Sequence, residues 1–170
     1  MRTTTRRYRG KIMKPQFILI IGESESGKSL LAKHLSEKYN IPIIESYTTR
    51  PRRHPKETGH TFVSLEEYQN TPKSEIIAET CFGEQYYYAT KDQVKDTNIY
   101  IVDEKGYLML RDKYTTLSLR VSRIVTKESS RRKRDNFVLP YDTFSCVVFN
   151  NGTKDEFFER ADEIVGKYYE

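Results

Sequence analysis

The segment Gly22-Glu23-Ser24-Glu25-Ser26-Gly27-Lys28-Ser29 has the spacing Gly-x-x-x-x-Gly-Lys-Ser, which is typical of a phosphate-binding loop. Its glycines let successive backbone N–H groups point at phosphate oxygens. Lys28 is spaced to reach the β- and γ-phosphates of a nucleoside triphosphate, and Ser29 to ligate Mg²⁺. The acidic residues Glu23 and Glu25 are unusual in a loop that binds polyanions, so we expect both side chains to point to solvent.

A second block, residues 46–53, is rich in guanidinium groups and leads into residues 57–64. Planar guanidinium forks bind the dianion of a phosphate monoester well. Arg50 and Arg53 are therefore candidates for holding a second phosphate compound, with a solvated charge run as the alternative. The sequence thus contains the parts of a two-substrate phosphoryl-transfer site.

Several segments together resemble the motifs of guanylate kinases: residues 46–53, 57–64, 76–79, 87–90, 101–106 and 144–150. The resemblance runs from residue 17 to the end of the chain. It implies ATP as the phosphoryl donor, Mg²⁺ as the metal, and GMP or dGMP as the acceptor. It also places Asn150 in the ATP-binding set with Gly22 to Ser29.

By this resemblance, the acceptor would be bound by Ser46, Arg50, Arg53, His60, Glu79, Tyr88 and Asp103. The arginines and the tyrosine would hold its phosphate. Guanine presents N1–H and a 2-amino group as donors, which Glu79 and Asp103 would accept, and an O6 that Ser46 would contact. Glu79 could instead be an ordinary surface acid, and residues 86–88 are expected to supply one functional tyrosine.

The chain departs from the family pattern at several positions. Ile101 stands where the family has an acid near the metal, and His60 stands where it has a phosphate-binding tyrosine. The lid, residues 122–144, is short. Since phosphoryl transfer depends on neutralising charge, Arg131 and Arg134 are the candidates for that role, against a plain basic face.

The expected elements alternate between strands and helices. Strands are predicted at residues 16–21, 41–45, 75–79, 85–90, 99–103, 116–121 and 145–149. Helices are predicted at residues 29–39, 65–69, 104–111 and 154–168, the second with Ser64 and Glu67 as a capping box. This order predicts one α/β domain over residues 1–170, with a doubly wound parallel sheet flanked by helices. The resemblance implies that this domain is a P-loop kinase with a reduced lid. Residues 46–97 would form the acceptor-binding subdomain.

Composition limits the other function classes. The formal net charge is +5, but five positive charges lie in residues 1–12, a basic arm that we expect to be disordered, so nucleic acid is not the expected partner. The longest apolar run, residues 17–21, is too short to cross a bilayer, and no secretory signal pattern is present. Cys81 and Cys146 fit two buried, reduced thiols of a cytoplasmic protein.

Three functions remain open from the sequence. The first is phosphorylation of a nucleoside monophosphate by ATP. The second is a P-loop kinase acting on another phosphorylated acceptor, such as a modified nucleotide or a ribose phosphate. The third is a non-catalytic binding module of guanylate-kinase-like fold, which the intact Lys28 and Ser29 disfavour.

Overall fold

The computed structural model describes residues 7–8, 11–127 and 129–169, with side chains at 7, 8, 11, 133 and 134 outside that description. Its centre is a parallel sheet with the strand order β10–β9–β3–β8. These strands are β3 (Phe17–Gly22), β8 (Asn98–Ile101), β9 (Thr116–Ser122) and β10 (Cys146–Phe149). All of β3 is buried, as expected of a strand covered on both faces.

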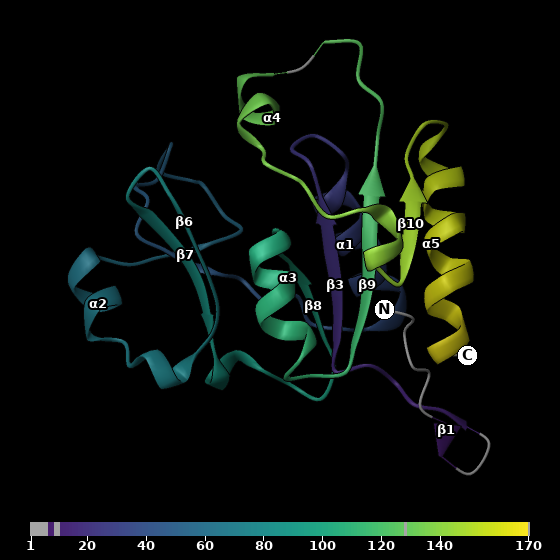
Figure 1. The fold of residues 1–170 in the computed structure, drawn as a ribbon, viewed down its shortest axis with the longest axis horizontal. Coiled ribbons are helices and arrows are strands. Elements are labelled where there is room, and N and C mark those ends of the chain that lie inside the picture. The colour runs from purple at the N-terminus through teal and green to yellow at the C-terminus, as the bar shows by residue number, and fades with distance from the viewer. Residues whose placement is uncertain (1–6, 9–10, 128, 170) are drawn as a thin grey trace.

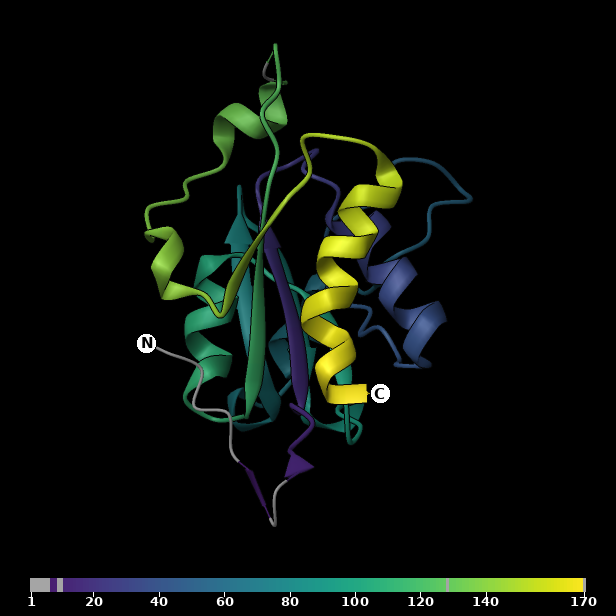
Figure 2. The ribbon, with the colours of Figure 1, turned by 90° about the vertical axis from the view of Figure 1, so that its right-hand side faces the viewer.

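Helices cover both faces of this sheet (Figures 1 and 2). Because side chains alternate along a strand, Ile18 and Ile20 pack with α1 (Lys28–Tyr39) and α5 (Lys154–Tyr169). Leu19 packs on the other side with α3 (Glu104–Arg111). The predicted α/β architecture, a parallel sheet flanked by helices, is confirmed.

The predicted strand at residues 41–45 is reduced to a single parallel bridge between Ile43 and Ile99. Pro42 accepts a hydrogen bond from the Ile99 N–H at 2.9 Å but has no N–H to donate. This proline therefore prevents the ladder from extending on its N-terminal side.

A second, mixed sheet with the order β5–β4–β7–β6 lies within residues 46–97 (Figure 1). Its strands are β4 (Tyr47–Thr48), β5 (Thr61–Phe62), β6 (Ile76–Phe82) and β7 (Gln85–Thr90). Gly83 and Glu84 have positive φ, the geometry of a tight hairpin turn between β6 and β7. Cys81, beside this turn on β6, is exposed, so the expectation of two buried thiols is wrong for Cys81. Helix α2 (Leu65–Asn70) covers one face and begins with the predicted Ser64–Glu67 capping box.

Two segments lie outside these sheets. In the lid segment, residues 122–144, the structure has a short helix α4 (Ser130–Arg134), above the carboxyl ends of β3 and β9 in Figure 1. In the basic arm, β1 (Arg7–Tyr8) pairs with β2 (Lys11–Ile12), while residues 1–6 and 9–10 lie outside the described part. Within residues 7–8, 11–127 and 129–169, no helix is both long and apolar enough to cross a membrane.

Candidate functional site

The loop between β3 and α1 has the tight packing that its two glycines permit. Gly27 has φ +104°, and a side chain there would meet the Asn150 amide nitrogen at 2.7 Å. A side chain at Gly22 would meet the carbonyl oxygen of Val121, also at 2.7 Å. Only glycine fits at either position, so the loop backbone is fixed against β9 and β10.

Asn150, predicted in the ATP-binding set, braces this loop from the end of β10. Its side-chain amide donates to the carbonyl oxygen of Ser26 at 2.9 Å, and its backbone N–H donates to Ser122 at 2.8 Å. It thereby joins the loop to the carboxyl ends of β9 and β10. Asn150 acts on the site through the loop backbone.

Lys28, the first residue of α1, folds back over the loop. Its Nζ donates to the carbonyl oxygens of Gly22 at 2.6 Å and Glu23 at 2.7 Å. Its pKa is lowered to about 8, chiefly by burial; the Asp135 carboxylate opposes this shift, and the Arg120 and Arg131 charges contribute to it. Ser29, the predicted Mg²⁺ ligand, is exposed on the first turn of the same helix.

The expectation that Glu23 points to solvent is wrong, whereas Glu25 is exposed as expected. The Glu23 carboxylate accepts from Arg132 Nε at 2.8 Å and from Arg120 Nη2 at 3.3 Å. The two guanidinium side chains are only 7% and 4% exposed. The acid is tolerated because two buried cations neutralise it, so the loop, β9 and α4 form one charged cluster.

Arg120 and Arg132 did not stand out in the sequence. Arg120 sits within a strand pattern, and Arg132 lies inside a basic run from which Arg131 and Arg134 were selected. Arg131 is exposed, yet close enough to Lys28 for its charge to lower the lysine pKa. The side chain of Arg134 is outside the described part of the chain.

Three buried polar atoms beside the loop have no hydrogen-bond partner among the described residues: Ser26 Oγ, Arg120 Nε and Arg132 Nη1. Buried polar groups are normally paired, so unpaired donors beside a phosphate-loop backbone fit an anionic ligand. These atoms support a polyphosphate at this position. Within residues 7–8, 11–127 and 129–169, no group of three or more His, Cys, Asp or Glu side chains could hold a metal ion. Ser29, the predicted Mg²⁺ ligand, would therefore need oxygens of a bound ligand to complete the coordination.

A cleft of about 600 Å³ connects this loop to the second sheet. Gly22, Ser24 and Lys28 line it on the loop side, and residues 135–139 of the lid segment close over it. The rest of the lining comes from β8, from α3 and from the second sheet with its loops, and it includes the predicted residues Ser46, His60, Glu79 and Asp103. The fold thus brings these four residues and the phosphate loop to one cavity, whereas Arg50, Arg53 and Tyr88 are not among its lining residues.

Arg50 is buried and does not line the cleft, but it contacts Tyr87, which does. It forms a two-point ion pair with Glu57, with Nη2 at 2.6 Å from Oε1, and donates from Nε to the Tyr87 hydroxyl at 3.0 Å. Hydrogen bonds from Arg50 and from the Arg53 N–H lower the Glu57 pKa to about 2. The Arg53 side chain is exposed, so the two predicted arginines differ in setting.

Ser46 and His60 are hydrogen-bonded to each other, with Ser46 Oγ at 2.9 Å from His60 Nδ1. Burial, with the nearby Arg50 charge, lowers the pKa of His60 below its ordinary value of 6.5. His60 is therefore neutral at pH 7 and would contact a ligand by hydrogen bonding and not by charge.

Neighbouring residues on the β6–β7 hairpin lie on opposite faces, which bears on the predicted site residues Glu79 and Tyr88. Residues opposite each other in an antiparallel pair share a face, and Glu79 pairs with Tyr88. Tyr88 is 3% exposed and packs on Tyr68 of α2, whose hydroxyl donates to the Glu79 carboxylate. Lys73 also pairs with Glu79, at 3.3 Å. Although Glu79 borders the cleft, its carboxylate is turned to the α2 face.

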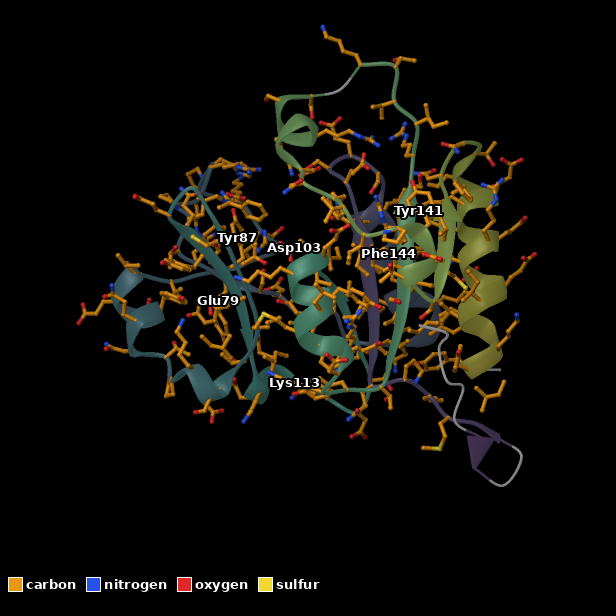
Figure 3. The ribbon with its side chains drawn as sticks, in the orientation of Figure 1. Glu79, Tyr87, Asp103, Lys113, Tyr141 and Phe144 are labelled. Carbon is orange, nitrogen blue, oxygen red and sulfur yellow. The ribbon has the colours of Figure 1, made fainter. Side chains whose placement is uncertain are left out.

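The next pair along the hairpin, Thr80 and Tyr87, faces the cleft instead. Thr80 Oγ1 lies 2.9 Å from both carboxylate oxygens of Asp103, and Tyr87 contacts Arg50. Figure 3 shows Tyr87 and Asp103 between the hairpin and the N-terminal end of α3. A shift of one residue reverses the face of a strand, so Thr80 and Tyr87 line the cleft, whereas Tyr88 does not and the Glu79 carboxylate points to α2.

Asp103 lines the cleft. It precedes α3 and caps that helix by accepting from the Gly106 N–H at 2.8 Å. Ile101, in place of a second acid, packs against the apolar core cluster beside α1 and α5. Asp103 is therefore the carboxylate that the end of β8 brings to the cleft.

No protein-family model and no curated protein matches the sequence. Among solved structures, the chain is similar to the guanylate kinase of Anaplasma phagocytophilum. That match has a TM-score of 0.63 and 19% identity over 91% of this chain and 85% of the other. An unliganded sugar kinase from Janibacter sp. HTCC2649 aligns with a TM-score of 0.45 and 12% identity, covering 86% and 92%. The first similarity agrees with the predicted fold class.

Proposed function

We propose that this protein is a phosphotransferase that uses ATP to phosphorylate a nucleoside monophosphate, with GMP or dGMP as the leading acceptor. The observation that carries the proposal is one cleft that the phosphate loop lines on one side and His60 and Tyr87 line on the other, with Arg50 hydrogen-bonded to the Tyr87 hydroxyl. Phosphoryl transfer needs both phosphates positioned in line and their charge neutralised. The guanylate kinase of similar fold is consistent with this reaction.

The donor half is assigned to residues 22–29. Loop N–H groups and Lys28 would hold the β- and γ-phosphates, and Ser29 would hold Mg²⁺, which supplies charge neutralisation. Arg132, with its unpaired buried Nη1, would contact the transferring phosphoryl group. Since Ile101 gives the metal no carboxylate, most of the neutralisation falls to Lys28, Arg120 and Arg132.

The acceptor half is assigned to the second sheet and the start of α3. Arg50, Arg53, Tyr87 and His60 would bind the acceptor phosphate, and Glu57 holds the Arg50 guanidinium in orientation. Asp103, accepting from Thr80, presents a carboxylate to the donors of a guanine base, and Ser46 presents a hydroxyl to O6.

One observation favours the second candidate, a kinase of another phosphorylated acceptor. The Glu79 carboxylate is bound by Tyr68 and Lys73 on the α2 face, so Asp103 is left as the base-reading acid. A site with fewer buried polar groups discriminates less strongly between bases.

The test is ADP release measured with ATP, Mg²⁺ and a panel of nucleoside monophosphates, alongside ribose 5-phosphate. We expect turnover with GMP or dGMP, loss of turnover in Lys28→Ala, and full activity in Lys33→Ala, an exposed lysine on the same helix. Turnover only with another acceptor would establish the second candidate. If no acceptor gave turnover that depends on Lys28, the remaining hypothesis would be a non-catalytic binding module.

A further inference from the structure

The Asp135 carboxylate lies on the phosphate loop itself. Asp135 Oδ2 accepts from the backbone N–H of Ser24 at 2.6 Å, and Oδ1 accepts from the Ser24 hydroxyl at 3.3 Å. Its negative charge also acts on Lys28, whose pKa it raises against the effect of burial. A carboxylate thus makes the contacts that a phosphate oxygen makes in such a loop.

Asp135 is delivered by a segment fixed at both ends, residues 135–139, which we call the strap. At its start, the Asp135 N–H donates to Arg132 at the end of α4, and Arg132 is ion-paired with Glu23. At its other end, the buried Glu104 carboxylate accepts from the N–H groups of Val138 and Leu139, each at 3.0 Å. The strap therefore spans the cleft from the phosphate loop to α3.

The middle of the strap is packed as well. Phe137 lies under the Arg120 guanidinium, 4.8 Å from its centre to the ring, and packs against the core beside α3. The closed position of the strap is thus supported by ion pairs, backbone hydrogen bonds and a cation–π contact.

We infer that Asp135 is an internal competitor for the polyphosphate of the donor, so that the free protein holds its own phosphate loop closed. The inference rests on the proposed function only in taking a polyphosphate as the ligand. The Ser24 N–H can donate to one anion at a time, and two anions would repel each other beside Lys28. Polyphosphate binding must displace the Asp135 carboxylate and open the strap at that end.

Binding of inorganic tripolyphosphate with Mg²⁺, measured by calorimetry on the full chain, tests the competition. We expect Asp135→Asn and Asp135→Ala to bind about tenfold more tightly than the wild type, the size of one charge-assisted hydrogen bond. Asp142→Asn is the matched control, because it removes the same charge from an exposed position seven residues further along the lid segment. It should bind as the wild type does.

The contact is also observable without ligand. In a ¹⁵N–¹H spectrum of the free protein, we expect the Ser24 amide proton to move upfield in Asp135→Ala and to stay in place in Asp142→Asn. An unchanged Ser24 amide in Asp135→Ala would overturn the inference. The inference would also be overturned if wild type, Asp135→Asn and Asp135→Ala bound tripolyphosphate with equal affinity while Lys28→Ala abolished binding. The proposed function would still stand in that case. If Lys28→Ala left tripolyphosphate binding unchanged in the wild type and in both Asp135 variants, the donor site and the competition would be overturned together.

Discussion

Glu23 of the phosphate loop and Arg132 of α4 are joined by an ion pair, with Arg132 Nη2 at 2.6 Å and Nε at 2.8 Å from Glu23 Oε2. The pair links the loop that would hold the donor to the short lid segment. The acidic residue that is out of place in a polyanion site is thereby explained: it holds a lid arginine over the loop. The remaining Nη1 of Arg132 is the donor left for a ligand.

The first prediction concerns this arginine. Arg132→Ala should lower kcat about 10²-fold, the effect typical of losing one electrostatic contact to the transition state, with a smaller change in the acceptor KM. Arg131→Ala, at the exposed residue that directly precedes Arg132, is the matched comparison and should lower kcat less. A larger loss in Arg131→Ala or Arg134→Ala would assign the lid role to the residues selected from the sequence.

The second prediction separates the two neighbouring tyrosines. Tyr87→Phe removes the hydroxyl that accepts from Arg50 and should raise the acceptor KM by about tenfold, the value of one hydrogen bond to a charged group. Tyr88→Phe keeps the ring packed on Tyr68 and should leave the KM unchanged, while lowering the free energy of unfolding by about 1 kcal/mol. Steady-state kinetics and urea unfolding measure the two. The reverse pattern in KM would return the functional role to Tyr88.

The third prediction separates the two candidate base-reading acids. Asp103→Asn can still cap α3, but it presents a mixed donor and acceptor to the base. The Asp103→Asn variant should raise the KM for GMP about 10²-fold and leave the KM for ATP unchanged. Glu79→Gln, whose carboxylate is bound on the α2 face, should change both values little. A Glu79→Gln effect on GMP as large as that of Asp103→Asn would show that Glu79 turns into the cleft when substrate binds.

The fourth prediction follows from the pKa of Lys28, lowered to about 8 by burial. The folded state disfavours the ammonium, so the penalty is fully present below pH 8 and disappears as pH rises towards the unfolded value near 10.5. Lys28→Met should therefore raise the free energy of unfolding by up to about 3 kcal/mol at pH 7, and by less at pH 10. Urea unfolding of both proteins at each pH measures the difference. A difference that does not shrink with pH would mean that Lys28 is not destabilised by burial.

The same pKa predicts a pH dependence of ligand affinity. Tripolyphosphate should bind more weakly as pH rises through 8, where Lys28 of the free protein loses its charge. Lys28→Arg remains charged over this range and serves as the control, with a flatter profile. If the affinity of the wild type changed as little with pH as that of Lys28→Arg, Lys28 would not be a contact of the phosphate.

Local patterns in the sequence predicted most of the fold because each is set by nearby residues. The buried run before Gly22, the apolar face of α1 and the capping box at Ser64 all have a local physical cause. The strand predicted at residues 41–45 is a single bridge in the structure. A proline at a sheet edge lacks one backbone donor of the ladder, although the residues around it are apolar. The chemistry of the donor loop was equally local, and Gly22 to Ser29 lie where the motif places them.

The site residues that were missed depend on non-local geometry. Whether Tyr87 or Tyr88 faces the cleft is decided by the register of β6 on β7, which three consecutive tyrosines do not specify. Arg120 became part of the site through the neighbouring strand order, and Arg132 through the path of the lid. Asp135 gave no motif signal at all, since its contact with Ser24 spans 111 residues.

The strand order also has a consequence for the chain as it is synthesised. β3 is complete at Gly22, but its first partner, β8, begins at Asn98, and its second, β9, at Thr116. At about 5–20 residues per second, roughly 4–15 s pass before a partner strand leaves the ribosome. The β6–β7 hairpin can pair at once, whereas β3 has only α1, which follows it directly, to pack against. In the nascent chain, the future centre of the sheet is thus the strand that waits longest for a partner strand.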